Sequence, residues 1–243
     1  MNANKLKNLI TIFDKVESTN LIAKKQALHS AHGTTIIAME QTGGYGRYGR
    51  SFYSPKGGLY QSIILEPSLL NITTYTAIVA LAAIVVCKAI QKLSPLQTPK
   101  IKWVNDIYID NLKVCGISAE TVSDPAVYKN NRIVLGIGIN FDTVTFPAEL
   151  KTIAGAVNGT PMLYAQEILE SILSCNLSEE DIFSEYKKRM LFLGKEVTVQ
   201  AGEKSYPALI LGLGASGELL IQKPCGEKHT LTAGEIRIKP PCI

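Results

Sequence analysis

The chain has 243 residues, of which 46% are hydrophobic and 19% charged, a composition typical of a globular protein with one large domain or a large and a small one. Its 25 Lys and Arg against 21 Asp and Glu give a formal net charge of +4, and no basic run predicts a nucleic-acid-binding arm. The five cysteines form no C-x-x-C pair, which argues against a zinc or redox motif and favours free thiols in the cytoplasm.

The N-terminal part of the sequence predicts a strand, a helix and a second strand, in that order. Residues 10–16 and 34–41 are apolar and β-branched, as strands are. Between them, Ser18 can cap a helix over residues 19–30, where apolar residues recur near helical spacing. The first 17 residues hold no apolar stretch long enough for a signal peptide, so we expect a cytoplasmic chain.

A glycine-rich stretch and a long apolar helix follow. The glycines gather in residues 41–60, and residues 59–65 alternate as a strand does. Residues 73–93 predict a long helix whose most apolar run, 75–90, is shorter than a membrane span and ends in polar residues. We therefore expect a buried core helix and no association with a membrane.

Strands and then two helices are predicted next. Residues 101–120 hold two strand-like runs around an Asp-Asn pair, which favours a hairpin turn because both residues tolerate positive φ. Residues 132–141 predict another strand. Residues 162–175 and 178–191 predict helices, the second with a serine cap and early acidic residues.

The last fifty residues have a different pattern. Short strands separated by glycine-containing turns predict a small antiparallel barrel. The predicted fold is therefore α+β, with helices packed on a mixed β-sheet in residues 1–192 and a small β-barrel in residues 193–243.

Gly44, Gly46 and Gly49 spell G-x-G-x-x-G within the glycine-rich stretch. A dinucleotide-binding loop requires a helix after the glycines, but Ser-Pro, Gly-Gly and then a strand follow. The companion motifs of protein kinases and the G-K-[ST] of a Walker loop do not occur in the sequence. Glycine N–H groups with Arg47 and Arg50 could bind a phosphate, and a flexible surface loop is the alternative.

Four stretches, in order and at compatible spacing, resemble the motifs of biotin–protein ligases. They are "ESTN" (17–20), "QTGGYGRYGRSFYSPKGGLY" (41–60), "KWVNDIYIDNLKVCGISAE" (102–120) and "GIGIN" (136–140). A weaker match extends into the last fifty residues, where this family has an SH3-like domain. The resemblance implies a catalytic domain like those of class II synthetases and lipoate ligases.

The resemblance also implies an activity. A biotin–protein ligase activates biotin with ATP to biotinyl-5′-AMP and transfers biotin to a lysine of a biotin carboxyl carrier protein, the acceptor domain of a carboxylase. Mg²⁺ would accompany the substrate phosphates, and the chain would be a monomer or a homodimer that binds no nucleic acid. A lipoate-type ligase of the same fold and a non-catalytic biotin-binding module remain as alternatives.

The site residues implied by the resemblance fall into three groups. Biotin contacts are expected from Ser18, Thr19, Asn20, Gln41, Tyr45, Gly46, Arg47, Lys113, Gly116 and Gly136. ATP or adenylate contacts are expected from Gly44, Arg47, Arg50, Phe52, Asn105 and Asn140. Lys113 and Arg47 would be catalytic, and Asn105 and Asp106 could hold Mg²⁺. Lys113 would span the biotin carboxylate and the α-phosphate, while the two glycines of the sheet would let the ligand approach closely.

Some of these residues have plain structural alternatives. Ser18 could simply cap a helix, Gln41 could end a strand in solvent, and Phe52 could be a core aromatic residue. The sequence also departs from the family, because Tyr45 stands where an arginine is usual and Val104 where a proline is usual.

Two further expectations come from the position of the motifs. The first motif begins near residue 18, which leaves no room for the DNA-binding domain that some relatives carry, so we expect a ligase alone. The loop of residues 42–56 should be mobile when empty and fold over the adenylate, because glycines lower its intrinsic order.

Overall fold

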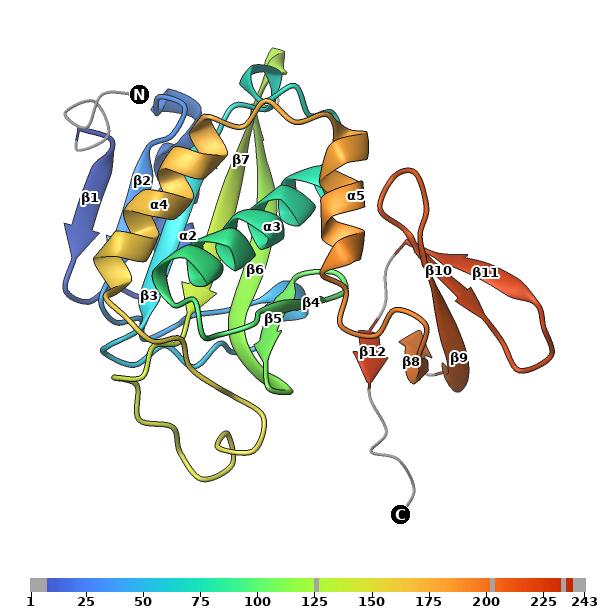
Figure 1. Ribbon diagram of the computed structural model, residues 1–243. Coiled ribbons are helices and arrows are strands. Elements are labelled where there is room, and N and C mark those ends of the chain that lie inside the picture. The colour runs from blue at the N-terminus through green and yellow to red at the C-terminus, as the bar shows by residue number, and fades with distance from the viewer. Residues whose placement is uncertain (1–7, 125–126, 202–203, 233–234, 238–243) are drawn as a thin grey trace.

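The computed structural model describes residues 8–124, 127–201, 204–232 and 235–237, and Figure 1 shows a large part beside a smaller sheet. The large part is built on a seven-stranded sheet in the order β1-β2-β3-β7-β6-β5-β4. Its strands are β1 (Ile10–Phe13), β2 (Thr35–Ala38), β3 (Leu59–Leu65), β4 (Lys100–Lys102), β5 (Asp106–Ile109), β6 (Leu112–Asp124) and β7 (Val127–Ile139). β1 and β2 are parallel and the other neighbours antiparallel, which confirms the predicted mixed sheet.

Helices cover both faces of this sheet. They are α2 (Thr19–Gln26), α3 (Tyr75–Leu93), α4 (Pro161–Leu173) and α5 (Glu179–Lys188), with 3₁₀ turns η1 (Ala27–His29), η2 (Arg47–Gly49) and η3 (Pro67–Leu69). Successive side chains of a strand point to opposite faces, so Ile37 and Ile63 enter the large core with α3, α4 and α5. Their neighbours Ile36 and Ile64 pack with Ala23 of α2 instead. α2 therefore packs on one face of the sheet, and α3, α4 and α5 pack on the other.

α3 is the central helix of the large core. Among the described residues it is the one helix long and apolar enough to cross a membrane by length and composition. Thirteen of its 19 residues are buried within the protein, as the sequence predicts for a core helix. Thr74 caps its N-terminus, because the Thr74 hydroxyl accepts a hydrogen bond from the N–H of Ala77.

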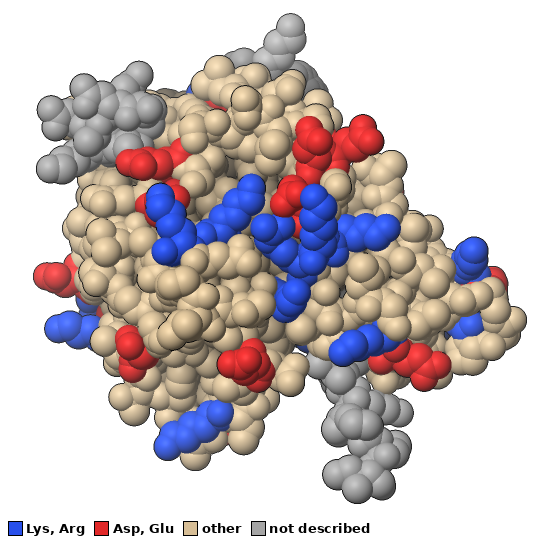
Figure 2. Space-filling view, viewed as in Figure 1, with Lys and Arg blue, Asp and Glu red and all other residues tan. Residues whose placement is uncertain are grey.

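The face covered by the long helices carries charges of both signs. Figure 2 shows Lys and Arg side chains gathered near the middle of this face, with acidic side chains beside them. Lys92 pairs with Glu167 at 2.6 Å, and Arg189 pairs with Glu185 at 2.8 Å. The first of these pairs is exposed on its lysine side and contributes little to stability, so the burial of α3 matters more.

The C-terminal residues form a separate antiparallel sheet in the order β11-β10-β9-β8-β12. The strands are β8 (Glu196–Ala201), β9 (Lys204–Leu213), β10 (Leu219–Gln222), β11 (Lys228–Leu231) and β12 (Glu235–Arg237). Val199 and Ile210 of this sheet belong to the same apolar core as Phe183 of α5. This all-antiparallel unit confirms the predicted fold class, whereas the domain boundary between residues 192 and 193 stays a prediction.

The cysteines agree with the predicted reduced state where the structure describes them. Cys87, Cys115, Cys175 and Cys225 are free thiols. Burial raises the pKa of the Cys87 thiol to about 12, which keeps it protonated and unreactive. Cys242 lies outside the described residues.

Glu179, the first residue of α5, ties that helix to the start of α3. Its carboxylate accepts hydrogen bonds from the N–H and hydroxyl groups of Thr73 and Thr74, at 2.5 to 2.9 Å. Burial raises the pKa of Glu179, but these four donors outweigh it and bring the pKa below the ordinary 4.5. Because the pKa is lower in the folded than in the unfolded chain, the ionised carboxylate stabilises the fold at pH values above 4.5. This stabilisation is lost as the pH falls through the folded-state pKa.

We expect Glu179→Gln to lower the free energy of unfolding at pH 7 by about 1 kcal/mol, since the carboxylate is partly exposed. The difference from the unchanged chain should shrink as the pH falls below 4.5. Urea unfolding at pH 7 and at acid pH measures it, and Glu180→Gln, in the same first turn, is the control. A difference that grows on acidification would contradict this account.

Candidate functional site

A cavity of about 240 Å³ lies on the α2 face of the sheet. It is bounded by the start of α2, the glycine-rich segment and the middle of β6 and β7. The predicted site residues that line it are Ser18, Thr19, Asn20, Gln41, Tyr45, Gly46, Arg47, Arg50, Phe52, Asn105, Asp106, Lys113, Gly116 and Gly136. Residues from four distant parts of the sequence therefore meet around one space.

The glycine-rich segment forms a small hairpin over this cavity. The N–H of Gln41 donates to the carbonyl of Ser54 at 2.9 Å, and the N–H of Phe52 donates to the carbonyl of Gly44 at 2.9 Å. Nearer the tip, the N–H of Gly46 donates to the carbonyl of Arg50 at 2.8 Å. The segment is thus a folded hairpin in this structure, and its mobility without ligand stays a prediction.

Gly44 lies inside the hairpin rather than on the cavity wall. A Cβ at this position would lie 2.4 Å from Ser54 Oγ and 2.8 Å from the Phe52 carbonyl oxygen. The glycine is required by the close approach of the two hairpin arms. The predicted contact of Gly44 with ATP therefore has no support from the lining of the cavity.

The two predicted catalytic cations face the same cavity from different elements. Arg47 lies at the hairpin tip, where its Nη1 donates to Asn105 Oδ1 at 3.4 Å. Lys113 lies on β6, and its Nζ is 2.7 Å from Asp106 Oδ1 on β5. The Lys113 ammonium also lies 5.8 Å from the centre of the Phe52 ring. Two cations at one cavity suit a ligand that carries several negative charges.

The pair predicted to hold Mg²⁺ does not make a metal site by itself. The Asp106 carboxylate faces the Lys113 ammonium, and the Asn105 side chain bonds Arg47 through Oδ1 and the carbonyl of Ile117 through Nδ2. Among the described residues, no group of three or more His, Cys, Asp or Glu side chains could hold a metal ion. One carboxylate already paired with a cation does not fit a resident Mg²⁺, which prefers several oxygen ligands.

The start of α2 contributes buried polar groups. Ser18 occupies the N-cap position, but its side chain makes no capping hydrogen bond, so the purely structural alternative for Ser18 is not realised. The N–H and hydroxyl of Thr19 both donate to Gln41 Oε1, at 2.8 and 3.1 Å. Gln41 is therefore part of the site rather than a solvated strand end, because its Nε2 also donates to Ser54 Oγ at 3.2 Å.

The glycines of β6 and β7 make room for other side chains. A Cβ at Gly136 would lie 2.4 Å from Asn20 Oδ1. A Cβ at Gly138, which pairs with Gly116 across the two strands, would lie 2.6 Å from Phe52 Cε1. The sequence predicts that Gly116 and Gly136 admit a ligand. In this structure the Asn20 side chain lies against Gly136 and the Phe52 ring lies against Gly116 and Gly138, and the contact of these glycines with a ligand stays a prediction. Phe52 is then a lining residue over the glycines and not a core aromatic residue.

Asn140 does not line the cavity. It is buried, its N–H donates to the carbonyl of Val114 at 2.9 Å, and its Nδ2 donates to the carbonyl of Gly155 at 3.2 Å. These bonds hold the segment after β7 against β6. The predicted contact of Asn140 with adenine thus lacks support from the cavity lining and stays a prediction.

Several lining residues were not assigned from the sequence. They are Ser51, Tyr60, Lys102, Trp103, Ile117, Ser118, Ile137 and Gly138. Ser118 and Gly138 lie two positions after Gly116 and Gly136 and so share a face with them, a signal that strand alternation offers. Trp103 is buried, and its Nε1 donates to the carbonyl of Gly217 at 3.1 Å.

Comparison with known proteins adds to this geometry. Residues 12–140 match the model of the "Biotin/lipoate A/B protein ligase family". The "Bifunctional ligase/repressor BirA" of Bacillus subtilis is 35% identical over 147 residues, which are 60% of this chain and 45% of that protein. The chain therefore spans less than half the length of this relative.

Two further similarities extend over nearly the whole chain. The "Biotin--[acetyl-CoA-carboxylase] ligase" of Paracoccus denitrificans is 25% identical over 91% of this chain and 97% of its own length. The solved structure "Biotin protein ligase from Aquifex aeolicus in complex with biotin and ATP" has a TM-score of 0.79 at 26% identity, covering 93% of this chain and 97% of its own. Because the family model matches more than half of its residues, this chain belongs to the biotin/lipoate A/B protein ligase family.

Proposed function

We propose that this protein is a biotin–protein ligase, which activates biotin with ATP and transfers it to a lysine of a biotin carboxyl carrier protein. The observation that carries the proposal is that Arg47 and Lys113, 66 residues apart in sequence, line one cavity together with the polar start of α2. The Aquifex aeolicus structure of similar fold binds biotin and ATP, and the Paracoccus denitrificans relative is named for acetyl-CoA carboxylase.

The start of α2 is suited to the ureido ring of biotin. This ring offers N–H donors and a carbonyl acceptor, and the buried residues Ser18, Thr19 and Asn20 offer hydroxyl and amide groups of both kinds. Gln41 bonds Thr19 and so fixes the arrangement of these groups before the ligand arrives. Such preorganisation lowers the entropy cost of binding.

In the first step, an oxygen of the biotin carboxylate attacks the α-phosphorus of ATP and pyrophosphate leaves. In this proposal the Lys113 ammonium contacts both the carboxylate and the α-phosphate, which reduces their repulsion and stabilises the charge that develops on phosphorus. Asp106 holds the ammonium in position at 2.7 Å before the substrates bind. Arg47, at the hairpin tip, adds a guanidinium for the phosphate oxygens.

In the second step, the amine of the acceptor lysine attacks the acyl carbon of the mixed anhydride, an amide forms and AMP leaves. The hairpin covers the cavity between the two steps, which limits the access of water to the anhydride. Phe52 lines the cavity, where its ring can stack on adenine.

Other parts of the proposal concern the surroundings of the enzyme. Mg²⁺ enters as the partner of the ATP phosphates rather than as a resident ion, because Asn105 and Asp106 are already engaged. The protein acts in the cytoplasm, as a monomer or a homodimer, on the carrier domain of a carboxylase.

Exchange of labelled pyrophosphate into ATP tests the proposed function. We expect exchange that depends on biotin and that lipoate does not replace. Exchange with lipoate instead would assign the protein to the lipoate-type ligases. Biotin binding without any exchange would show a non-catalytic module and overturn the proposal.

Arg47→Gly should separate adenylate formation from its retention. Loss of the guanidinium removes the hairpin's contact with Asn105, and glycine adds backbone freedom at the tip. We expect biotinyl-5′-AMP to appear in solution at least about tenfold faster per adenylate formed, the effect of losing one charged hydrogen bond. Labelling of lysines on a bystander protein measures it, and Arg47→Lys should fall between the two. Unchanged release would contradict this role.

A further inference from the structure

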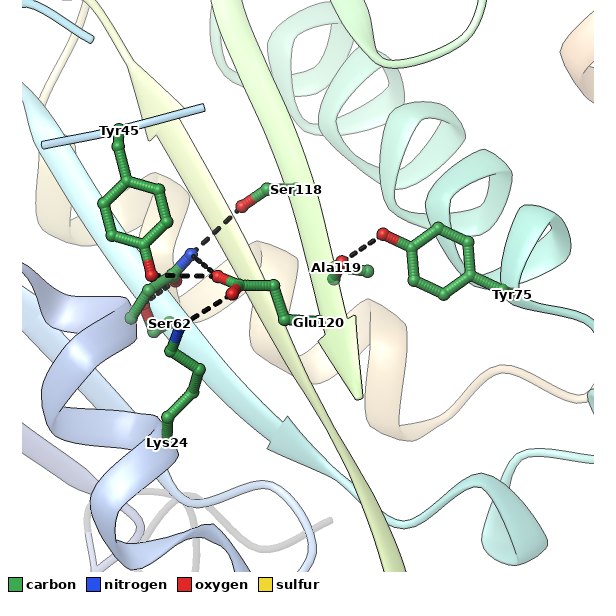
Figure 3. A network of polar contacts seen from close by, with 8 residues as sticks. Lys24, Tyr45, Ser62, Tyr75, Ser118, Ala119 and Glu120 are labelled. Carbon is green, nitrogen blue, oxygen red and sulfur yellow. Dashed lines mark hydrogen bonds and ion pairs between the residues drawn. The ribbon is translucent and has the colours of Figure 1, made fainter. Parts of the chain in front are cut away.

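Glu120 joins the glycine-rich hairpin to α2, as Figure 3 shows. Its Oε1 accepts hydrogen bonds from the Tyr45 hydroxyl at 3.0 Å and from Asn20 Nδ2 at 3.2 Å. Its other oxygen, Oε2, lies 2.7 Å from Lys24 Nζ. One carboxylate on β6 thus holds the hairpin and α2 at the same time, although 75 residues separate Tyr45 from Glu120.

The hairpin needs such a contact because of its composition. Tyr45 lies between Gly44 and Gly46, and residues without a Cβ leave the backbone many conformations. The cross-arm hydrogen bonds fix the hairpin internally, but they do not fix its position over the sheet. The Tyr45 hydroxyl reaches down to Glu120, and Arg47 at the tip reaches Asn105.

Lys24 and Tyr45 both keep the protons that they donate to Glu120 at neutral pH. Burial disfavours the charged form of Lys24, but its contacts with Glu120 and Tyr45 together outweigh burial and raise the pKa of Lys24. Burial raises the pKa of Tyr45, so the phenol stays protonated and remains a donor at neutral pH. Lys24 also lies 5.4 Å from the centre of the Tyr45 ring, which adds a cation–π contact to the same group of side chains.

We propose that Tyr45 and Glu120 form a latch that holds the hairpin closed over the cavity, with Lys24 balancing the charge of the carboxylate. Both are positioning residues, because they act through the placement of Arg47 and the hairpin backbone. Since Asn20 donates to the same oxygen as Tyr45, closing the hairpin and ordering the biotin end of the cavity share one acceptor. The role in retaining the adenylate rests on the proposed function, whereas the closure itself does not.

Hydrogen exchange in the unliganded chain tests the closure. Tyr45→Phe removes only the hydroxyl, and we expect the amides of residues 43–50 to lose about tenfold in protection, the effect of one hydrogen bond to a charged acceptor. The loss should disappear when Tyr45→Phe is made in a Glu120→Ala background. Tyr53→Phe is the matched control, since its hydroxyl bonds the carbonyl of Thr145 instead and it should leave residues 43–50 unchanged.

The outcomes separate the latch from general structure. Unchanged protection in Tyr45→Phe, an equal loss with and without Glu120, or a loss spread over the whole sheet would each overturn the proposal. A retention measurement completes the test: Tyr45→Phe should raise the release of biotinyl-5′-AMP per adenylate formed by about tenfold, and Tyr53→Phe should not. An equal ratio in the two variants would overturn the role in retention. If the unchanged chain shows no biotin-dependent exchange of pyrophosphate, the proposed function fails. The hydrogen-exchange result for closure of the hairpin still stands in that case.

Discussion

Lys113→Ala is expected to reduce biotin-dependent exchange of pyrophosphate by at least about 100-fold, the scale on which removal of one preorganised electrostatic group acts. The side chain is partly exposed and its backbone bonds the segment that follows β7, through the carbonyl of Ile153 and the N–H of Gly155. Those backbone bonds do not depend on the ammonium. The fold should therefore persist, with a thermal midpoint close to that of the unchanged chain.

Two additional variants sharpen this test. Lys92→Ala is the matched control, because Lys92 is also paired with an acid, Glu167, at 2.6 Å. Lys92 lies on the face covered by the long helices, so this variant should leave the exchange of pyrophosphate unchanged. Lys113→Ala also leaves Asp106 as an unpaired negative charge beside the phosphates, so adding Asp106→Asn should recover ATP binding but not turnover. Near-normal exchange in Lys113→Ala would contradict the catalytic assignment.

Gly136→Ala is expected to weaken biotin binding by about 10–100-fold and to lower the free energy of unfolding by about 1–3 kcal/mol. A Cβ at this position would lie 2.4 Å from Asn20 Oδ1 and 2.7 Å from Ser118 Oγ. The backbone cannot move aside easily, because Gly136 is paired with Ser62 of β3 and with Ser118 of β6. Asn20 must therefore leave its position, and its hydrogen bonds to Ser62 and Ser118 are lost with it.

Titration calorimetry with biotin and thermal unfolding measure the two effects of Gly136→Ala separately. Ser118→Ala is the comparison, because it removes a hydroxyl from the same place without adding volume. It should lose less affinity and less stability than Gly136→Ala. An equal or larger loss in Ser118→Ala would show that hydrogen bonding, and not space, governs this part of the cavity.

Most of the architecture could be predicted from local patterns, but the lengths of elements depend on pairing. The alternation and β-branched residues of β3 predict it correctly over Leu59–Leu65. β7 was predicted from residue 132, yet it begins at Val127, because pairing with β6 extends the strand through residues of low strand propensity such as Asn131. The glycine-rich segment was predicted as a loop, and its glycines instead let two arms approach as a hairpin.

Cavity residues that belong to sequence motifs could be predicted, whereas contacts between residues far apart in the sequence could not. Arg47 and Lys113 lie in recognisable motifs, and the structure places both at one cavity. No local pattern links Lys24 of α2 to Glu120 of β6, which are 96 residues apart and meet only because α2 crosses the sheet. Gly44 and Asn140 belong to motifs too, but close packing of the hairpin and of the segment after β7 keeps them off the cavity wall.

The hydrogen bond from Trp103 Nε1 to the carbonyl of Gly217 should give the C-terminal sheet an influence on ligand binding at the cavity. Trp103 borders the cavity on one side and rests on the turn between β9 and β10 on the other. A chain truncated before residue 193 would keep every side chain proposed to touch biotin or ATP, yet its indole would face water with no fixed partner. Amino-acid changes around Gly217 should therefore alter ligand binding from outside the cavity, and a shortened chain without the small sheet should bind ligand less well.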